Sequence, residues 1–156
     1  MIFIIIILFV FLLLLSKHKE HFAVHPKIVY KCFSKKEIDS FGNFYKHSRI
    51  IYGKEKKSLC YITPTKYIDK IPSISWNGYY INNFCVEPHS RRKGYGKNLL
   101  DKIKKISYKE GKDHLILQVD GENIKAINFY KKNNFFNYFR GMDKFGKLKI
   151  FMVKYL

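Results

Sequence analysis

A basic, glycine-containing turn at residues 91–97 has the clearest potential for binding chemistry in this sequence. It follows an apolar segment, 79–86, and precedes residues with helical spacing. Glycine lets the backbone turn and expose successive N–H groups, and a helix start adds about half a positive charge. The turn consists of Arg91, Arg92, Lys93, Gly94, Tyr95, Gly96 and Lys97. This pattern predicts a site for a pyrophosphate, and a basic surface turn is the alternative.

Hydrophobic spacing predicts the elements that position this turn. Apolar side chains at Tyr95, Leu99, Leu100, Ile103 and Ile106 predict a helix through residue 109, which Gly111 ends. Alternating or continuous apolar runs predict strands over 27–33, 58–62, 79–86, 114–119, 135–140 and 148–156. We expect further helices within 35–48 and over 123–132, and an irregular loop or a weak strand over 63–78. The pattern indicates one mixed α/β (α+β) domain over residues 25–156.

The net charge of +18 arises from 30 lysine and arginine residues against 12 aspartate and glutamate residues. Such a charge suggests an anionic partner such as nucleic acid, acidic lipid or a polyphosphate. Only four of these residues are arginine, and Ile, Asn, Tyr and Phe are abundant while Ala is rare. We therefore interpret most of the charge as a result of AT-rich codons. We expect nucleic acid to bind only nonspecifically, at low salt.

The first 15 residues are all apolar, and Ser16-Lys17-His18-Lys19 follows them. A helix of this length would span about 22 Å, short of the ~30 Å hydrocarbon core, and the two lysines can snorkel to make up part of the difference. No basic residue precedes the run, so the sequence favours an uncleaved anchor over a signal peptide. We predict a transmembrane anchor over 1–16, a basic linker over 17–24 and a single-pass membrane protein with its folded domain on the cytosolic side.

The cysteines Cys32, Cys60 and Cys85 are odd in number and form no C-x-x-C pair. No histidine lies at a spacing that would complete a zinc site with them. The sequence therefore predicts neither a disulfide framework nor a metal site. His18 and its neighbours His21 and His25 are interpreted as solvated residues.

Two segments resemble the signature motifs of the GNAT superfamily of N-acetyltransferases. Residues 86–100 are similar to motif A, V-x-P-x-x-R-x-x-G-x-G/A-x-x-L-L, at every defining position. Residues 117–135 are similar to the second motif, L-x-V-x-x-x-N-x-x-A-x-x-F-Y-x-x-x-G-F, with Asn134 in place of the glycine. Asparagine is the residue that best replaces glycine where left-handed backbone is needed.

The resemblance implies a fold, an activity and a set of roles. The implied fold has a mostly antiparallel sheet whose two middle strands splay apart, with helices on its faces. The implied activity is transfer of an acetyl group from acetyl-CoA directly to a primary amine of a protein or small molecule. The implied coenzyme-binding residues are Phe84, Cys85 and Val86 through their main chain, the turn from Arg91 to Lys97, and Asn123 along the pantetheine arm.

Tyr130 matches the tyrosine that the family uses as a general acid, which protonates the departing thiolate. A phenol with a pKa of about 10 is protonated at neutral pH and can donate to a thiolate whose conjugate acid has a pKa near 8.5. Without the motif, a core aromatic on an amphipathic helix is the simpler interpretation. Cys85 is interpreted as a packing residue, because acyl transfer in this family is direct and needs no nucleophilic side chain.

The general base stays open at this stage. The candidate carboxylates are Glu87, Asp120, Glu122 and Asp69, and Tyr80 and Asn82 are an alternative pair that could order water. Each carboxylate is also explained by solvation or helix capping. Two alternative functions remain: a noncatalytic basic module that binds anionic lipid or nucleic acid, and transfer of a longer acyl chain.

Overall fold

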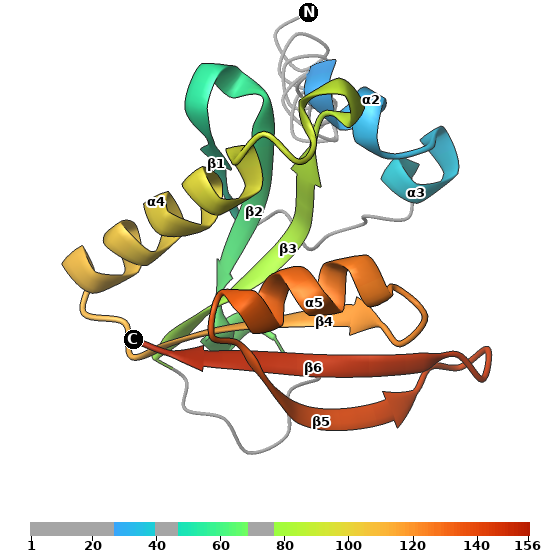
Figure 1. Cartoon of the computed structure of the whole chain (residues 1–156). Helices are drawn as coiled ribbons and strands as arrows, with labels where there is room; N and C mark the ends of the chain where they lie inside the picture. Colours follow the sequence, from blue (N-terminus) through green and yellow to red (C-terminus); the bar gives the residue numbers. More distant parts are fainter. Residues whose placement is uncertain (1–26, 40–46, 69–76) are drawn as a thin grey trace, which may run out of the picture.

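The computed structural model describes residues 27–39, 47–68 and 77–156. Figure 1 draws the remaining residues as a grey trace. The predicted anchor over 1–16 and linker over 17–24 therefore lie outside the described residues. In the part of the chain that the structure describes, no helix combines the length and the apolar character needed to cross a membrane.

A six-stranded sheet forms the centre of the fold, in the order β1-β2-β3-β4-β6-β5. Its strands are β1 (Arg49–Tyr52), β2 (Ser58–Pro64), β3 (Gly78–Val86), β4 (His114–Asp120), β5 (Phe136–Met142) and β6 (Leu148–Tyr155). Only β3 and β4 pair in parallel, and every other neighbouring pair is antiparallel. The mixed, mostly antiparallel sheet that the resemblance to the GNAT superfamily implies is confirmed.

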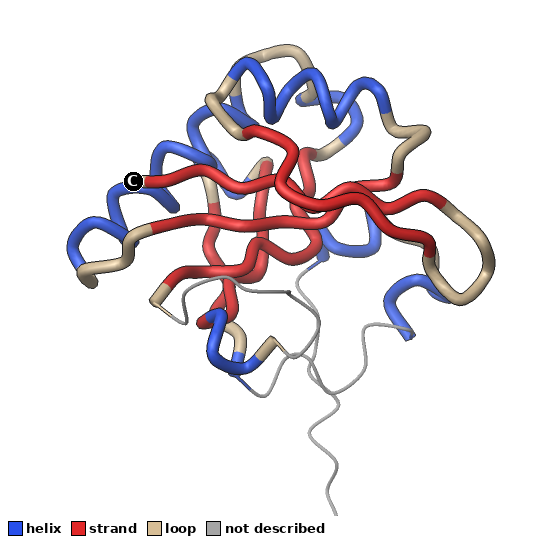
Figure 2. The backbone as a smooth tube through the Cα atoms, turned by 90° about the horizontal axis from the view of Figure 1, so that it is seen from below, coloured by secondary structure: helices blue, strands red, loops and turns tan. Residues whose placement is uncertain are grey.

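Two longer helices, α4 (Tyr95–Lys109) and α5 (Ile124–Lys132), lie on one face of the sheet (Figures 1 and 2). Their apolar sides pack into the main core, where Leu99, Leu100 and Ile103 of α4 are fully buried. Burial of each such side chain stabilises the fold by about 1.5–3 kcal/mol. The same core holds Cys60 and Ile62 of β2.

The other face of β2 and β3 is covered by the amino-terminal part of the described chain. Helix α2 (Lys27–Cys32) buries Ile28 and Val29 against Leu59, Tyr61 and Cys85. Because successive side chains of a strand point to opposite faces, Leu59 and Tyr61 face α2 while Cys60 faces α4. Helix α3 (Lys35–Asp39) begins with a capping box, in which the Glu37 carboxylate accepts from the Ser34 backbone N–H at 2.7 Å.

Three short 3-10 turns complete the described elements, η2 (Lys54–Lys56), η3 (Thr65–Tyr67) and η4 (Pro88–Ser90). The turn η4 directly precedes the predicted phosphate-binding segment. Residues 69–76 of the predicted loop, together with residues 40–46, are outside the described residues.

Three sequence-based expectations are wrong. Residues 27–33 form helix α2 and not a strand, and residues 49–52, for which we predicted no strand, form β1. The expected absence of a disulfide is contradicted, because Cys32 and Cys85 form one across 53 positions of sequence. The helix and the disulfide could not be predicted from local sequence, since a six-residue helix depends on tertiary contacts and cysteine pairing depends on the folded chain.

The prediction for the turn after α5 is correct. Asn134 has a φ of 64°, the left-handed conformation that the family motif assigns to glycine. The backbone N–H of Phe135 donates to the Tyr130 carbonyl at 3.0 Å, and this bond closes the helix end. The substitution of asparagine for glycine thus preserves the turn.

Candidate active site

The strands β3 and β4 pair over only part of their lengths. Their register runs from Gly78↔His114 to Ile81↔Leu117, although β3 continues to Val86 and β4 to Asp120. Beyond Ile81 the edge of β3 that faces β4 is no longer paired with it. Exposed strand edges recognise extended ligands through main-chain hydrogen bonds.

A bulge in β3 marks the point where the two strands part. Asn83 has a φ of 47°, and the β2–β3 register shifts between Leu59 and Tyr61. An extra residue on one strand bends it and increases its twist. The bend carries Phe84, Cys85 and Val86 away from β4 while the pairs Leu59↔Cys85 and Ser58↔Val86 hold their other edge to β2.

The turn between β3 and α4 has the backbone conformation of an anion-binding loop. Gly94 is left-handed with a φ of 81°, and Arg92 is also left-handed with a φ of 63°. A Cβ placed on Gly94 would meet nothing within 4 Å, so there is open space beside the turn. Gly94 also begins α4 without a side-chain cap, and the first N–H groups of a helix have no partners within the helix. These features fit a phosphate group.

Gly96 is needed for close packing, whereas its position in the glycine-containing turn suggests a role in turning the backbone. Its φ is not in the left-handed region, and a Cβ on it would lie 3.3 Å from the Phe129 ring and 3.5 Å from Val86. Gly96 therefore lets the start of α4 approach both α5 and the end of β3. This close packing joins the three elements that carry the predicted site residues.

The basic side chains of the turn are used unequally. The Arg91 Nε donates to the Val86 carbonyl at 3.1 Å, so this side chain fixes the turn to the end of β3. Lys97 pairs with Asp101 at 2.8 Å. Arg92 and Lys93 are exposed, and they are the best placed of the four to meet an anion from solvent. Coenzyme binding by these residues stays a prediction.

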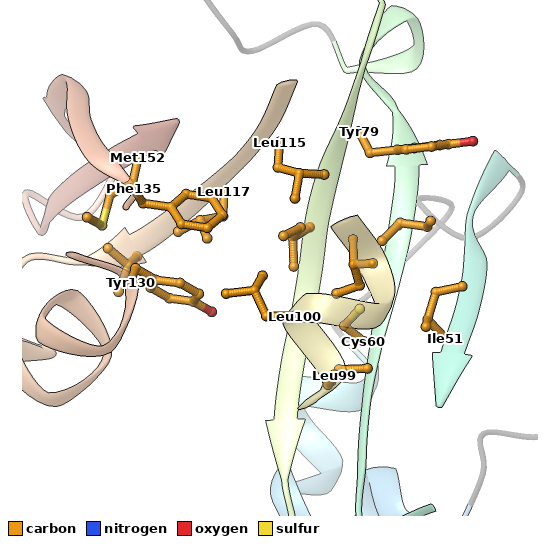
Figure 3. Packing of buried hydrophobic residues seen from close by; sticks show 14 of the residues in the cluster. Ile51, Cys60, Tyr79, Leu99, Leu100, Leu115, Leu117, Tyr130, Phe135 and Met152 are labelled. Atoms are coloured by element: carbon orange, nitrogen blue, oxygen red, sulfur yellow. The ribbon is translucent and has the colours of Figure 1, made fainter. Parts of the chain in front are cut away.

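Tyr130 lies on α5 next to the free end of β3. Its ring is 6.0 Å from that of Phe84 and 5.2 Å from that of Phe129, in edge-to-face arrangements. Figure 3 shows its hydroxyl directed toward Leu100 of α4. The residue is only 7% exposed, and burial raises the pKa of Tyr130 above its ordinary value. The phenol is therefore held in its protonated form, as a general acid requires.

Asn123 is the residue that begins α5. Its side-chain oxygen accepts from the Ala126 backbone N–H at 3.1 Å, which is the bond of an N-cap. Asn123 is therefore the N-cap of α5, and its contact with the pantetheine arm stays a prediction. Asp120 does not cap the helix with its side chain, because its carboxylate pairs with Lys149 at 2.5 Å.

The remaining candidates for the general base differ in their surroundings. Lys31 pairs with Glu87 at 2.5 Å and lowers the pKa of that carboxyl, which makes it a weaker base. Burial raises the pKa of Tyr80 to about 12. The Asn82 side-chain amide donates to Thr63 Oγ1 at 2.8 Å. Asp69 is outside the described residues.

A cavity of about 340 Å³ opens at the carboxyl end of β4, the end at which β3 and β4 part. It is lined by Asp120, Glu122, Asn123, Lys147 and Leu148. This size lies within the usual range for small-molecule sites, about 300–1,000 Å³. The contribution of the β5–β6 hairpin, through Lys147 and Leu148, is not visible in the sequence because these residues match neither motif. In the described part of the chain, no three His, Cys, Asp or Glu side chains gather closely enough to hold a metal ion.

Comparisons with known proteins agree with this arrangement. Residues 67–135 match the acetyltransferase (GNAT) family. A 57-residue segment is 37% identical to the uncharacterized N-acetyltransferase YhfO of Bacillus subtilis (strain 168), and the match covers 36% of this chain and 38% of that protein. The chain thus matches well under half the length of this curated relative.

Solved structures share the fold at low sequence identity. A GNAT family acetyltransferase from Elizabethkingia anophelis with acetyl-CoA bound superposes with a TM-score of 0.65 at 15% identity, covering 87% of this chain and 95% of that chain. The ribosomal-protein-S18-alanine N-acetyltransferase from Escherichia coli gives a TM-score of 0.59 at 18% identity, covering 82% and 83%.

A mixed six-stranded sheet with one short parallel pair, covered on one face by two helices that carry the site, is the GNAT fold. The family match over residues 67–135 covers less than half of the chain, and it includes β3, α4, β4 and α5, the elements that carry the site.

Proposed function

We propose that this chain is an N-acetyltransferase that transfers an acetyl group from acetyl-CoA directly to a primary amine. The observation that carries the proposal is the parting of β3 and β4 beyond Ile81, with the turn at Gly94 at one end and the protonated Tyr130 beside it. A noncatalytic basic module would not need these three features in one place.

The coenzyme occupies the free edge of β3 and the turn that follows it. Its pyrophosphate binds the backbone N–H groups at the start of α4, with Arg92 and Lys93 adding positive charge. Its pantetheine arm extends along the main chain of Phe84, Cys85 and Val86, whose edge toward β4 is unpaired. The thioester supplies the activated acetyl group.

The chain's own chemical contribution is a proton at the Tyr130 hydroxyl. As the neutral amine attacks the carbonyl and the carbon–sulfur bond breaks, Tyr130 Oη donates its proton to the sulfur, and the proton that the amine nitrogen loses restores the phenol through solvent. Because burial keeps this phenol protonated, the donor is ready at every physiological pH. The Phe84 and Phe129 rings hold the phenol in position from two sides.

The acceptor amine enters through the cavity at the end of β4. Asp120 and Glu122 line it, and because Asp120 is paired with Lys149, Glu122 is the carboxylate that attracts a protonated amine in a chain whose overall charge would repel one. The attacking amine must first lose a proton. This costs about 1–1.5 kcal/mol at pH 7 for an α-amine but about 4–5 kcal/mol for a lysine side chain.

We also propose that residues 1–16 anchor the enzyme in a membrane and that the acetyltransferase domain faces the cytosol. The support is the apolar run of 15 residues and the placement of all positive charge after it.

The test is acetylation by the purified full chain in mild detergent. Amino-terminal peptides, lysine peptides, polyamines and amino acids are supplied with acetyl-CoA, and free thiol and acetylated product are both measured. We expect stoichiometric release of both with at least one acceptor class. Binding of acetyl-CoA without transfer to any acceptor class would favour the noncatalytic alternative. Faster turnover with a longer acyl-CoA than with acetyl-CoA would favour transfer of a longer acyl chain.

A further inference from the structure

The disulfide between Cys32 and Cys85 joins two parts of the chain that meet only in the folded molecule. Cys32 is the last residue of α2, and Cys85 lies near the end of β3. Their Cα atoms are 6.0 Å apart, within the 4.4–6.8 Å range usual for disulfides. The third cysteine, Cys60, is free and buried on the opposite face of the sheet.

Cys85 lies in the segment of β3 that the proposed coenzyme needs. It comes two residues after the bulge at Asn83, where β3 has already left β4. From there to the end of the strand, β2 is the only strand among the described residues that pairs with β3. A strand that is paired on both edges is held in position by its two neighbours. This segment is paired on one edge, so its position depends more on the side chains that pack against its face.

Helix α2 is the element that packs behind this segment. Ile28 and Val29 contact the side chains around Cys85, and Lys31 pairs with Glu87 immediately after β3. A six-residue helix has little stability of its own, because isolated helices need about 12–15 residues. A covalent bond at its last residue fixes it to β3. Without that bond, α2 is held to β3 by one small apolar cluster and an exposed ion pair.

The two sulfur atoms also differ in access. Cys32 is partly exposed, whereas Cys85 is 3% exposed, so an attacking thiolate reaches the Cys32 sulfur first. Disulfides in reducing compartments such as the cytosol are transient and respond to the thiol pool. The proposed cytosolic location would therefore make this pair reversible.

We propose that Cys32 and Cys85 form a redox modification site that controls coenzyme binding, and this inference rests on the proposed function. A dithiol reductant attacks the Cys32 sulfur, the bond to the Cys85 sulfur breaks, and the second thiol of the reductant completes the exchange. The protein gains two electrons and two protons as two thiols, and the reductant becomes a disulfide. Reduction releases α2 from β3, and the coenzyme-side edge of β3 is then held in its binding conformation only part of the time.

The test compares the oxidised full chain with the same chain reduced by excess dithiothreitol. Peptide mapping under nonreducing conditions establishes the Cys32–Cys85 bond, and calorimetric titration measures acetyl-CoA affinity. If the binding conformation falls to about one tenth of the population, affinity falls about tenfold. The Cys32→Ser variant should show the weaker affinity in both conditions, while Cys60→Ser should keep the wild-type redox response.

A second readout separates this inference from the proposed function. Hydrogen exchange of the backbone amides of α2 and of residues 84–86 should speed up on reduction in the wild type and in Cys60→Ser. If acetyl-CoA binds in neither state, the proposed function fails. Hydrogen exchange alone then decides whether the Cys32–Cys85 bond fixes α2 to β3. An absent disulfide under oxidising conditions, or unchanged exchange, overturns the redox site. If acetyl-CoA affinity is the same in the oxidised and reduced chain, the disulfide does not control coenzyme binding.

Discussion

Replacing Tyr130 with phenylalanine isolates the proposed acid function, because it removes one oxygen atom and keeps the ring. The ring contacts with Phe84, Phe129 and Phe135 at 6.0, 5.2 and 5.5 Å depend on the aromatic carbons and remain. Burial and nearby side chains, and no hydrogen bond from a described residue, account for the raised pKa of this hydroxyl. Its removal therefore strands no buried polar group, and we expect the free energy of unfolding to change by less than about 0.5 kcal/mol.

The effect on catalysis should be much larger. A positioned general acid contributes about 10² to 10⁴ in rate, which corresponds to about 2.7–5.4 kcal/mol of transition-state stabilisation. Because this interaction forms only as the thiolate departs, kcat and kcat/KM should fall together while acetyl-CoA affinity is unchanged. The pKa of Tyr130 is raised by burial, so the wild-type rate should show no alkaline decline from this group at or below pH 10.

The assay is steady-state release of free coenzyme A with the true acceptor, together with thermal unfolding and calorimetric titration. Tyr108→Phe is the matched control, since Tyr108 is 60% exposed on α4 and should retain full activity. A Tyr130→Phe enzyme with wild-type kcat would show that the thiolate departs unassisted or that another group donates the proton. A large loss of stability would instead show that the residue is structural.

Three further predictions test the other parts of the site and the anchor. Gly96→Asp should abolish acetyl-CoA binding in a calorimetric titration. The new Cβ would lie 3.3 Å from the Phe129 ring, and the carboxylate would repel phosphate. Unchanged affinity would refute the placement of the turn. Glu122→Gln should lower kcat/KM for cationic acceptors by about 2- to 5-fold and leave neutral ones unaffected, as expected for an exposed charge pair, and an equal loss for both would contradict the acceptor route. In sealed vesicles, a tag at Leu156 should be digested by protease added on the cytosolic side and an amino-terminal tag should be protected; the reverse pattern would refute the orientation.

Local patterns in the sequence were sufficient to predict the elements of the carboxyl-terminal two thirds. The spacing of Leu99, Leu100 and Ile103 predicted α4 with the bounds that the structure shows, because an amphipathic helix needs only one continuous apolar face. The glycine position filled by Asn134 predicted a left-handed turn, because few other residues tolerate that conformation. The residues around Gly94 and Tyr130 predicted the similarity to the GNAT family that the match over residues 67–135 shows, because their spacing is short and fixed.

Only the tertiary structure decided how distant segments use one another. Helix α2 was predicted as a strand because its few residues carry no period long enough to distinguish helix from strand, and its contacts with β2 and β3 select the helix. The Cys32–Cys85 bond depends on a 6.0 Å approach across 53 positions. Gly96 is required by the proximity of Phe129, not by its own backbone, and Glu87 is weakened as a base by Lys31 from α2. These contacts cannot be predicted from composition or from residue spacing, because they form only when the whole chain packs.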